Sequence, residues 1–570
     1  MIFYDFEVFM YDWLVVLADT DKRLETVIIN NPARLNQFYD TQMNNIWCGF
    51  NSRFYDQYIL KGIICGFNPK MINDHIIIEG RPGWEYSNLF RNIQLYNYDV
   101  MISGDCGLKA FEGFMGSDIK ESSVPFDIDR RLTAKEIDEV VKYCKHDVEQ
   151  TRELLIHRNN EFRTKRGLIR IASGDGPINL DLINLTTPQL SAYILQAYKQ
   201  PRDDEFDIHF PPTLKLNKYN EVMDWYKNPC NHNYDKENQP VVSVAGIPHH
   251  FGYGGLHGAR SNYHSKGYFL HIDVTSLYPS LMIEYNLLSR NVHNPAKFKQ
   301  LYEQRLQYKR EGNPLHESLK LALNSTYGAM KDKKNALYDP RQANYVCICG
   351  QLLLLYLIEL LEPFIELVQS NTDGLIIRMP DMYTPDSWYE AIDEICFVWE
   401  QRTRLKLEFS EYDEIYQKDV NSYILRSGRD YKSKGAWVKK LTPLDYDLPI
   451  VNKALINRMI HGKKIEDTVN SCNELIEFQL VAKLSGKYTH LLHGSRRLKE
   501  KYVRVFASKN DSDGGLIKYH AKTGRPAKVA NSPEHCFIYS ESVTNVKTPE
   551  HLDRDWYINL AYKRLKEFGE

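Results

Sequence analysis

From Met1 to about Asn160, short apolar runs alternate with amphipathic ones, and this pattern predicts an α/β unit. The chain opens on an apolar, strand-like run, MIFYDFEVFMYDWLVVLADT. The unit ends in a strongly amphipathic stretch from Thr133 to His157, where Thr133 followed by Glu136 has the spacing of a capping box. We therefore expect a sheet packed against helices, the last of which is long.

The pattern is less regular from residue 161 to about residue 244. A helical run lies near Gln189 to Tyr198, among polar, Asn-rich and Pro-containing stretches such as Lys227 to Gln239. This composition predicts a connector subdomain, and the sequence assigns it no role.

Regular patterning returns after residue 250. A glycine-rich turn at Phe251 to Gly258 precedes a strand at Tyr268 to Val274. Two helical runs on either side of Gly312 to Pro314 predict a helical hairpin. A long apolar helix at about Gln342 to Leu361 and a strand pair around Asn371 to Gly374 come next, and the tail mixes strands and helices.

Length and composition limit the function classes. At 570 residues the chain has room for several domains of roughly 100 to 200 residues. Its 43% hydrophobic and 26% charged residues are typical of a soluble globular protein, and we expect no membrane-spanning segment. The first apolar run contains acids and lacks a basic leader, so we expect no secretory signal and a cytoplasmic location. Ten scattered cysteines without a C-x-x-C pair favour reduced thiols.

Charge is distributed unevenly although the formal total is only -2. Residues 431 to 570 contain 25 Lys and Arg against 16 Asp and Glu. Most of this excess lies between Lys483 and Lys528, where cations alternate with apolar and aromatic residues; the cations are Arg496, Arg497, Lys499, Lys501 and Arg504. We expect a strand or loop that follows a phosphate backbone, with a solvated basic face as the alternative.

Three clusters of acids occur in the N-terminal region. Asp5 and Glu7 lie two residues apart on the first strand, so both carboxylates point to the same face and could hold a cation. Two acids on a strand are usually only solvated, and the other clusters change that expectation. They are Asn51, Tyr55 and Asp56, then Tyr143 and Asp147.

In this order the clusters resemble the Exo I (D-x-E), Exo II (N-x-x-x-F/Y-D) and Exo III (Y-x-x-x-D) motifs of proofreading 3′ to 5′ exonucleases with a ribonuclease-H-like fold. The resemblance implies that four carboxylates hold two divalent metals: Asp5, Glu7, Asp56 and Asp147. It implies that Tyr143 orients the attacking water, and that Asn51 and Tyr55 contact a single-stranded 3′ end. A metal pair suits phosphodiester hydrolysis because it activates water and neutralises the leaving oxygen.

Residues 271 to 280, HIDVTSLYPS, resemble motif A (D-x-x-S-L-Y-P-S) of family B DNA polymerases. The resemblance implies that Asp273 is a metal-binding catalytic acid and that Val274 offers its carbonyl to the metal. It implies nucleotide contacts at Ser276, Leu277 and Tyr278. Tyr278 would lie under the sugar and exclude a 2′-hydroxyl.

Residues 320 to 328, KLALNSTYG, resemble motif B (K-x-x-x-N-S-x-Y-G) on the second helix of the hairpin. Helical spacing places Lys320, Asn324 and Tyr327 on one face. Arg305 and Lys309 are four residues apart on the facing helix. The resemblance implies that Arg305, Lys309 and Lys320 converge on a triphosphate, with Asn324 and Tyr327 beside the nucleotide.

Residues 370 to 374, SNTDG, depart from motif C (Y-x-D-T-D-S) of the same family. Asn371 replaces the first acid and Gly374 the final serine, whereas the second acid is present as Asp373. The resemblance implies that Asp273 and Asp373 form the catalytic pair. Because Asn371 brings no charge, we expect weaker metal binding or a lower rate.

Two shorter patterns are weaker signals. FGYGG at 251 to 255 resembles the Y-x-G-G turn, and KSKG at 432 to 435 resembles K-x-K-G; NSY at 421 to 423 stands where the family has K-x-Y. The DNA contacts that these patterns imply are Tyr253, Gly254, Gly255, Tyr423, Lys432 and Lys434.

The motifs extend from residue 5 to about residue 435 and are similar to those of a compact, phage-like family B polymerase with a proofreading exonuclease. The resemblance implies an α+β multidomain fold in which a ribonuclease-H-like domain precedes a right hand of palm, fingers and thumb. The expected domains are an exonuclease (1–160), a connector (161–250), a first palm part with motif A (251–294), a fingers hairpin (295–330), a second palm part with motif C (331–435) and a basic thumb (436–570).

The same resemblance implies two Mg²⁺ ions in each active site, with Mn²⁺ as a substitute. It implies three partners: primer-template DNA, dNTPs and a single-stranded DNA 3′ end in the exonuclease site. The short intervals between the motifs leave no room for the insertions of protein-primed polymerases, so we expect no terminal-protein priming. If the chain is viral, the expected location is the host cytoplasm, and the sequence assigns no clamp or other replisome partner.

Two alternatives remain open at this stage. One is an exonuclease with a degenerate polymerase half, which Asn371 would permit. The other is a non-catalytic DNA-binding replisome protein, which would bind DNA in a salt-sensitive manner without turnover.

Overall fold

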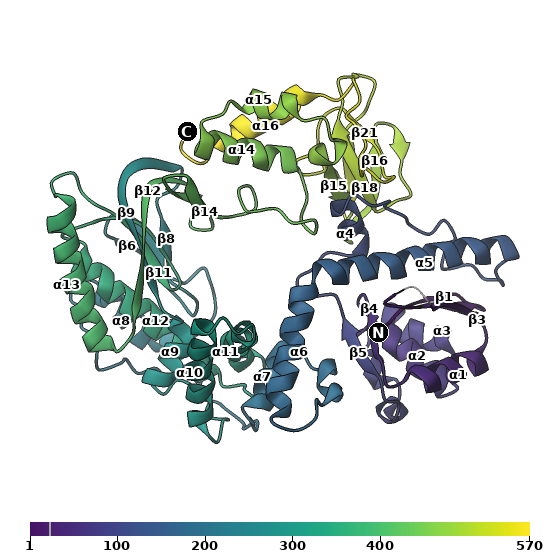
Figure 1. Ribbon diagram of the computed structural model, residues 1–570, viewed down its shortest axis with the longest axis horizontal. Helices are drawn as coiled ribbons and strands as arrows, with labels where there is room; N and C mark the ends of the chain where they lie inside the picture. The colour runs from purple at the N-terminus through teal and green to yellow at the C-terminus, as the bar shows by residue number, and fades with distance from the viewer. Residues whose placement is uncertain (22–23) are drawn as a thin grey trace.

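The computed structural model describes residues 1–21 and 24–570 (Figure 1). In the view of Figure 1 the N-terminal region lies at the lower right, the central region at the left and the C-terminal region at the top. Helices α5 (Ala134–His157) and α6 (Asn159–Ser173) join the N-terminal region to the central region. The described elements are α-helices and β-strands in four sheets.

The N-terminal region is built on a five-stranded sheet in the order β3-β2-β1-β4-β5. Neighbours β1–β2 and β2–β3 are antiparallel, whereas β1–β4 and β4–β5 are parallel. The strands are β1 (Ile2–Val8), β2 (Trp13–Asp19), β3 (Glu25–Ile29), β4 (Ile46–Gly49) and β5 (Tyr96–Asp99). The helices are α1 (Pro32–Gln42), α2 (Asp56–Ile64), α3 (Pro69–Asn73), α4 (Leu108–Phe114) and α5, with short turns η1 (Asp74–Ile78), η2 (Gly83–Glu85) and η3 (Asn88–Asn92). These elements confirm the α/β prediction.

Helix α5 begins as its sequence predicts. Thr133 and Glu136 form the reciprocal capping box, and the helix continues to His157. The chain leaves helical geometry at Arg158 before α6 starts. The guanidinium of Arg158 is 6% exposed and bonds the Val100 carbonyl at 2.8 Å and Asp105 Oδ2 at 2.6 Å. The bend between α5 and α6 is therefore fixed by a buried, satisfied cation.

The connector is helical and packs on the central region. Its helices are α6, α7 (Thr187–Ile194) and α8 (Asn220–Lys227), with short turns η4 (Leu180–Asn184) and η5 (Pro229–Asn231). Ser191 on α7 lies 2.7 Å from the hydroxyl of Ser325, so the connector contacts the helix that carries the motif-B residues. The helix expected at Gln189 to Tyr198 starts earlier and ends at Ile194, because the chain turns at Gln196 with a left-handed φ of 53°.

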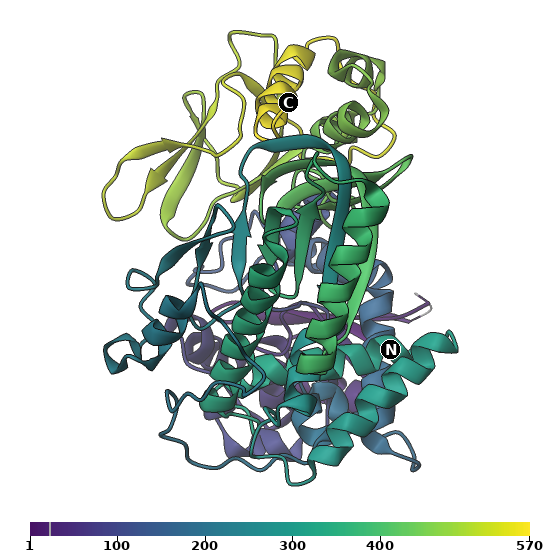
Figure 2. The same ribbon diagram turned by 90° about the vertical axis from the view of Figure 1, so that its left-hand side faces the viewer.

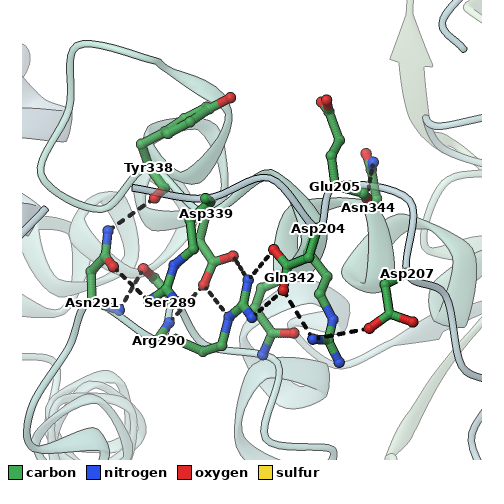
Figure 3. A network of polar contacts seen from close by, with 12 residues as sticks. Asp204, Glu205, Asp207, Ser289, Arg290, Asn291, Tyr338, Asp339, Gln342 and Asn344 are labelled. Atoms are coloured by element: carbon green, nitrogen blue, oxygen red, sulfur yellow. Dashed lines mark hydrogen bonds and ion pairs between the residues drawn. The ribbon is translucent and has the colours of Figure 1, made fainter. Parts of the chain in front are cut away.

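A network of ion pairs anchors the connector to the central region (Figure 3). Arg290 bonds Asp204 at 2.6 Å and 2.9 Å, and Asp339, which is fully buried, at 2.7 Å and 2.9 Å. Arg341 reaches Asp204 at 3.1 Å and Asp207 at 3.3 Å. Hydrogen bonds from Arg290 lower the pKa of Asp204 well below its usual value. The connector thus fixes the segments on both sides of the helical hairpin.

The central region has a nine-stranded sheet in the order β14-β13-β12-β9-β11-β10-β8-β7-β6. Its strands are β6 (Val241–Val244), β7 (Ile247–His250), β8 (His257–Ala259), β9 (Tyr263–Val274), β10 (Glu366–Asn371), β11 (Gly374–Arg378), β12 (Leu407–Asp419), β13 (Ser422–Ser427) and β14 (Asp430–Lys434). Its helices are α9 (Leu277–Glu284), α10 (Pro295–Arg310), α11 (Leu315–Lys331), α12 (Pro340–Leu361) and α13 (Pro385–Thr403). The predicted hairpin (α10 and α11), apolar helix and strand pair are confirmed, and β9 starts at Tyr263 rather than at the predicted Tyr268.

Helix α12 is the core helix of this region. By length and composition it is the one helix of the described chain that could cross a membrane, but 89% of its most apolar window is buried inside the protein. Its apolar side chains pack in the largest hydrophobic core of the molecule. Burial on all sides accounts for a helix that is apolar all round.

The C-terminal region contains two small sheets, β15-β18-β21 and β17-β16-β19-β20. Its strands are β15 (Leu480–Lys483), β16 (Tyr488–His493), β17 (Arg496–Arg497), β18 (Tyr502–Ala507), β19 (Leu516–His520), β20 (Pro526–Lys528) and β21 (Cys536–Ile538). Its helices are α14 (Pro449–His461), α15 (Ile465–Ser471) and α16 (Arg554–Lys566), with a short turn η6 (Leu475–Phe478). Figure 2 shows the yellow-green strands of the second sheet extending away from the helices.

Arg504 corrects one expectation from the sequence. The sequence groups it with cations that follow a phosphate backbone, but its side chain is 0% exposed because α4 packs on β18, the middle strand of its sheet. Its guanidinium donates to the carbonyls of Gly113 at 3.0 Å, Ser117 at 2.8 Å and Glu541 at 2.7 Å. Arg504 therefore joins the C-terminal region to α4 and the loop after it. Figure 1 shows α4 next to β15 and β18.

Candidate active sites

The acids predicted in the N-terminal region gather around strand β1, and we call Asp5, Glu7, Asp56 and Asp147 the N-terminal acidic site. Asp5 and Glu7 alternate along β1 with the buried residues Tyr4, Phe6 and Val8. Asp56, the first residue of α2, accepts a hydrogen bond from the Phe6 amide at 3.0 Å. The Phe6 amide is free for this contact because β4 pairs only with the start of β1.

Helix α5 brings the remaining acid and two neighbours to the same place. Asp147 is 7% exposed on α5, one turn from Tyr143. The Cys144 thiol lies 3.3 Å from the backbone carbonyl of Asp5 and 3.4 Å from its carboxylate. The ligand atoms of Asp5, Glu7 and Cys144 lie within 4.8 Å of one another. The sequence did not single out Cys144.

Lys109 is a further member of this site that the sequence did not reveal. Its ammonium group contacts the Asp147 carboxylate, lies 2.9 Å from Glu112 Oε1 and stands 4.5 Å from the centre of the Tyr143 ring. Glu112 is fully buried and also lies 3.6 Å from His146 Nε2. Lys109 and Glu112 come from α4, whose short pattern carries no motif that could have identified them.

The electrostatics of the N-terminal acidic site show an excess of negative charge. Burial and the neighbouring carboxylates raise the pKa of Asp5 and of Glu7 well above their ordinary values. Burial raises the pKa of Asp56 to about 7, and that of Asp147 to about 6 in spite of the contact with Lys109. A divalent cation would stabilise the ionised form of these crowded carboxylates.

The two predicted contacts for a single-stranded end differ in accessibility. Asn51 is exposed in a left-handed turn with φ 59°, and its backbone amide donates to Asp99 Oδ1 at 2.9 Å. Tyr55 is half-buried, and its hydroxyl donates to Asn73 Oδ1 at 2.8 Å. Asn51 is therefore open to a ligand through its side chain, whereas the Tyr55 hydroxyl is occupied.

The acids predicted in the central region lie at the end of β9. Asp273 is opposite Gly374 in the β9–β11 pairing, and the Val274 amide donates to the Asp373 carbonyl at 2.7 Å. Glu408 on β12 is the direct cross-strand neighbour of Asp273 on the other side. We call Asp273, Asp373 and Glu408 the central acidic site. Glu408 was not predicted, because its place depends on the pairing of strands that lie far apart in the sequence.

Two glycines permit this arrangement. A Cβ on Gly374 would lie 2.3 Å from Asp273 Oδ1, and a Cβ on Gly255 would lie 2.5 Å from Thr372 Oγ1. A side chain at position 374 would therefore displace the Asp273 carboxylate from its present position. Gly254 would meet no atom within 4 Å and stays exposed to solvent.

A cavity of about 380 Å³ opens over the central acidic site. Its lining combines acids with cations from helix α10 and strand β14. The lining residues that bear on the chemistry are Asp273, Asp373, Glu408, Arg305, Lys309, Lys432, Lys434, Ser276, Val274, Asn371, Gln369 and Tyr423. Motifs that are far apart in the sequence thus share one cavity.

Arg305 is the strongest sign that this cavity receives an anion. Its side chain is 9% exposed, one nitrogen donates to Ser276 Oγ at 2.8 Å, and its Nε has no partner. Among the described residues no carboxylate pairs with it. Ser276 can accept this bond because it turns the chain between β9 and α9 with a left-handed φ of 49°. A buried, unpaired guanidinium favours a phosphate or carboxylate ligand.

The motif-B residues divide into two groups. Lys320 and Asn324 are exposed and do not line the cavity, and Lys320 lies 3.9 Å from Glu317. The expected convergence of Lys320 with Arg305 and Lys309 is therefore absent from this structure. Tyr327 instead packs against Tyr278, with ring centres 4.5 Å apart, beside the buried Leu277.

The other predicted DNA contacts lie around the cavity or in the core. Lys432 and Lys434 are exposed on β14, and Lys432 Nζ lies 3.4 Å from His271 Nδ1. Tyr423 is 4% exposed on β13. Tyr253 is 6% exposed, and its hydroxyl donates to the Asn231 carbonyl at 3.1 Å. Tyr253 and Tyr423 therefore offer little surface to DNA.

The central carboxylates interact with one another and with nearby cations. Burial raises the pKa of Asp273 to about 6; Asp373 and Glu408 add to the rise, and Lys432 opposes it. Burial also raises the pKa of Asp373, against Lys434 and Lys432. Burial and the two lysines lower the pKa of His271 to about 4, so this imidazole, 3.2 Å from Asp273, is neutral at pH 7.

Both sites have donor sets that fit Mg²⁺. Hard divalent cations prefer carboxylate and carbonyl oxygens. Each site supplies several such oxygens in a partly buried setting, and in each the carboxyl pKa values are raised from their ordinary range. Gln369 is among the residues that line the central cavity; it is 1% exposed, and its buried Oε1 has no hydrogen-bond partner.

No protein-family model matches the chain, and no curated protein matches it. Among solved structures it is similar to the family B DNA polymerase from the hyperthermophilic archaeon Pyrobaculum calidifontis, with 14% sequence identity and a TM-score of 0.41, over 100% of this chain and 78% of that one. At this TM-score the similarity carries no functional conclusion, so the residues of the chain itself must supply it.

Proposed function

We propose that this chain is a template-directed DNA polymerase of the family B type that also degrades DNA from the 3′ end. The observation that carries the proposal is that Asp273, Asp373, Arg305 and Lys309 line one cavity. Phosphoryl transfer requires acids that hold Mg²⁺ and cations that hold the phosphates, and this cavity offers both.

In the central cavity, Arg305 and Lys309 would bind the phosphates of a dNTP. Arg305 is held by Ser276, so its guanidinium is already positioned. Asp273, Asp373 and the Val274 carbonyl would hold Mg²⁺, which supplies charge neutralisation at the reacting phosphate when bound. Tyr278, packed on Tyr327, would lie against the sugar and favour a deoxyribose.

In the N-terminal acidic site, the four carboxylates would hold Mg²⁺, which supplies an activated water and a neutralised leaving oxygen when bound. Lys109 keeps Asp147 ionised at neutral pH through its ammonium contact. Tyr143 lies beside this pair, where its hydroxyl would orient the water. Asn51, exposed at the end of β4, would contact the 3′ nucleotide. The strand order 3-2-1-4-5 supports a ribonuclease-H-like arrangement.

The exposed cations of the C-terminal region support a role in holding the DNA backbone. Arg496 and Arg497 on β17 and Lys499 beside it are exposed, and no ion pair involves them in the described part of the chain. Phosphate contacts of this kind would make DNA binding salt-dependent.

Extension of a labelled primer on a DNA template tests the proposed function. With Mg²⁺ and one dNTP at a time, the chain should add only the nucleotide complementary to the template, and Asp373→Ala should abolish this addition. Asp381→Ala is a matched control, since Asp381 is 91% exposed and lies outside the cavity. Degradation of the primer without any extension by the unaltered chain, in Mg²⁺ or Mn²⁺, would leave only the exonuclease alternative that Asn371 permits.

A further inference from the structure

The central acidic site lacks the first acid of its motif. Asn371 occupies that position at the end of β10, and its side-chain amide lies 3.4 Å from the Val420 carbonyl, to which it donates. The amide therefore interacts with the β12–β13 turn and adds no charge to the cavity. Asp273 and Asp373 are the acids that the two motifs contribute.

Glu408 brings a third carboxylate to the same cavity from a different strand. In the antiparallel pairing of β9 and β12 it stands directly opposite Asp273. Directly opposite residues project from the same face of a sheet, with Cβ atoms about 5 Å apart. Glu408 lines the cavity, and the Thr275 hydroxyl donates to its Oε1 at 3.2 Å. This hydrogen bond holds the carboxylate beside the motif-A turn.

The surroundings of Glu408 are those of a cation site. The negative charges of Glu408 and Asp373 both raise the pKa of Asp273, so the three carboxylates are close enough to interact. Gln369 lines the same cavity, is 1% exposed and keeps its Oε1 without a partner. A buried acceptor with no donor is costly, and a water molecule beside it would supply the missing hydrogen bond.

We propose that Glu408 supplies the third carboxylate of the polymerase site and takes the place of the acid that Asn371 lacks. Asp273, Asp373 and Glu408 together would hold the Mg²⁺ ions. The third carboxylate would then come from Glu408 on β12 instead of from position 371 on β10. The inference rests on the proposed polymerase function, because it assigns Glu408 to that reaction.

Exchanging the two positions tests this assignment. Glu408→Gln should lower kcat/KM for primer extension by about 100-fold. Adding Asn371→Asp to that variant should restore extension to within about 10-fold of the unaltered chain, since the acid returns from the other strand. Degradation of single-stranded DNA should stay unchanged in both variants, which shows that they are folded. Glu411→Gln is the matched control, because Glu411 lies on β12 opposite Leu270 and outside the cavity.

Binding of Mn²⁺, followed by electron paramagnetic resonance, gives a second measurement that needs no turnover. In an Asp5→Ala background, which weakens the N-terminal site, Glu408→Gln should weaken Mn²⁺ binding about 10-fold or more, and Asn371→Asp should recover it. Unchanged Mn²⁺ binding and unchanged extension in Glu408→Gln would overturn the proposal, as would a failure of Asn371→Asp to restore either. If the unaltered chain does not extend primers, the proposed function fails, and the Mn²⁺ titration still decides whether Glu408 is a ligand.

Discussion

The two acidic sites differ in the cations that lie near their clustered carboxylates. The N-terminal acidic site is buried, draws acids from β1, α2 and α5, and carries its own cation in Lys109. The central acidic site is more open: Asp273 is 38% exposed and lines a cavity of about 380 Å³ together with four cations, Arg305, Lys309, Lys432 and Lys434. Several cations around an open cavity can bind an anionic ligand, whereas a single buried ammonium group mainly stabilises the carboxylate that it contacts.

Removing the contact between the C-terminal region and α4 should have the largest effect, and it should lower the activity of the N-terminal site more than that of the central site. Arg504→Met leaves three carbonyls without donors, so we expect the free energy of unfolding to fall by about 3 kcal/mol. Because α4 also carries Lys109, degradation of single-stranded DNA should fall more than primer extension. Urea unfolding and the two assays measure this, with the exposed Arg497→Met as control; equal losses of both activities would contradict it.

A methyl group at Gly374 should affect only the central site. In Gly374→Ala the new Cβ would lie 2.3 Å from Asp273 Oδ1, so the carboxylate must move. We expect primer extension to fall about 100-fold while degradation is unchanged. Gly486→Ala, where a Cβ would meet nothing within 4 Å, is the control. Full extension activity in Gly374→Ala would mean that the Asp273 position is not set by this contact.

Loss of the internal cation should affect only the N-terminal site. Lys109→Met removes the ammonium group that faces Asp147 and Glu112. We expect degradation of single-stranded DNA to fall about 30-fold, with primer extension retained. The measurement is the degradation rate as a function of Mg²⁺ concentration, with the exposed Lys142→Met on α5 as control. Degradation at the parent rate would show that Lys109 is only structural.

The smallest effect should be on the pH dependence of stability. The pKa of Asp56 is about 7 in the folded chain, against about 4 when unfolded, so the folded state binds the proton more tightly. Without metal, stability should therefore fall as pH rises from about 4 to about 7. Asp56→Asn should raise the free energy of unfolding at pH 8 by about 2 kcal/mol and flatten this dependence. Thermal unfolding in EDTA measures it, with Asp40→Asn as control; a lower free energy of unfolding for Asp56→Asn than for the unaltered chain at pH 8 would contradict this prediction.

The sequence predicted what lies within one element and missed what strand pairing and packing create. The capping box of α5, the hairpin of α10 and α11 and the strand pair around Asn371 follow from local patterns. Glu408 reaches the central site only because β12 pairs with β9, and Lys109 reaches the N-terminal site only because α4 packs beside α5. Neither residue stands in a motif that sequence spacing could reveal.

At Arg504 a local sequence pattern gave a wrong prediction, because packing between two regions decides whether this side chain is exposed. Alternating cations and apolar residues predicted an exposed strand along a phosphate backbone. The strand is central in its sheet and covered by α4, so a residue of the alternating pattern points into an interface between regions. Burial lowers the pKa of Arg504 to about 10, and the nearby charges of Asp118, Tyr539 and Glu112 oppose this effect.

The most direct test measures extension and shortening of one labelled primer on its template in Mg²⁺, with and without dNTPs. It compares the unaltered chain with Asp5→Ala and Asp273→Ala. We predict that the unaltered chain extends with dNTPs and shortens the primer without them, that Asp5→Ala only extends, and that Asp273→Ala only shortens. Loss of both activities in either variant, or extension that survives Asp273→Ala, would contradict the assignment of one reaction to each acidic site.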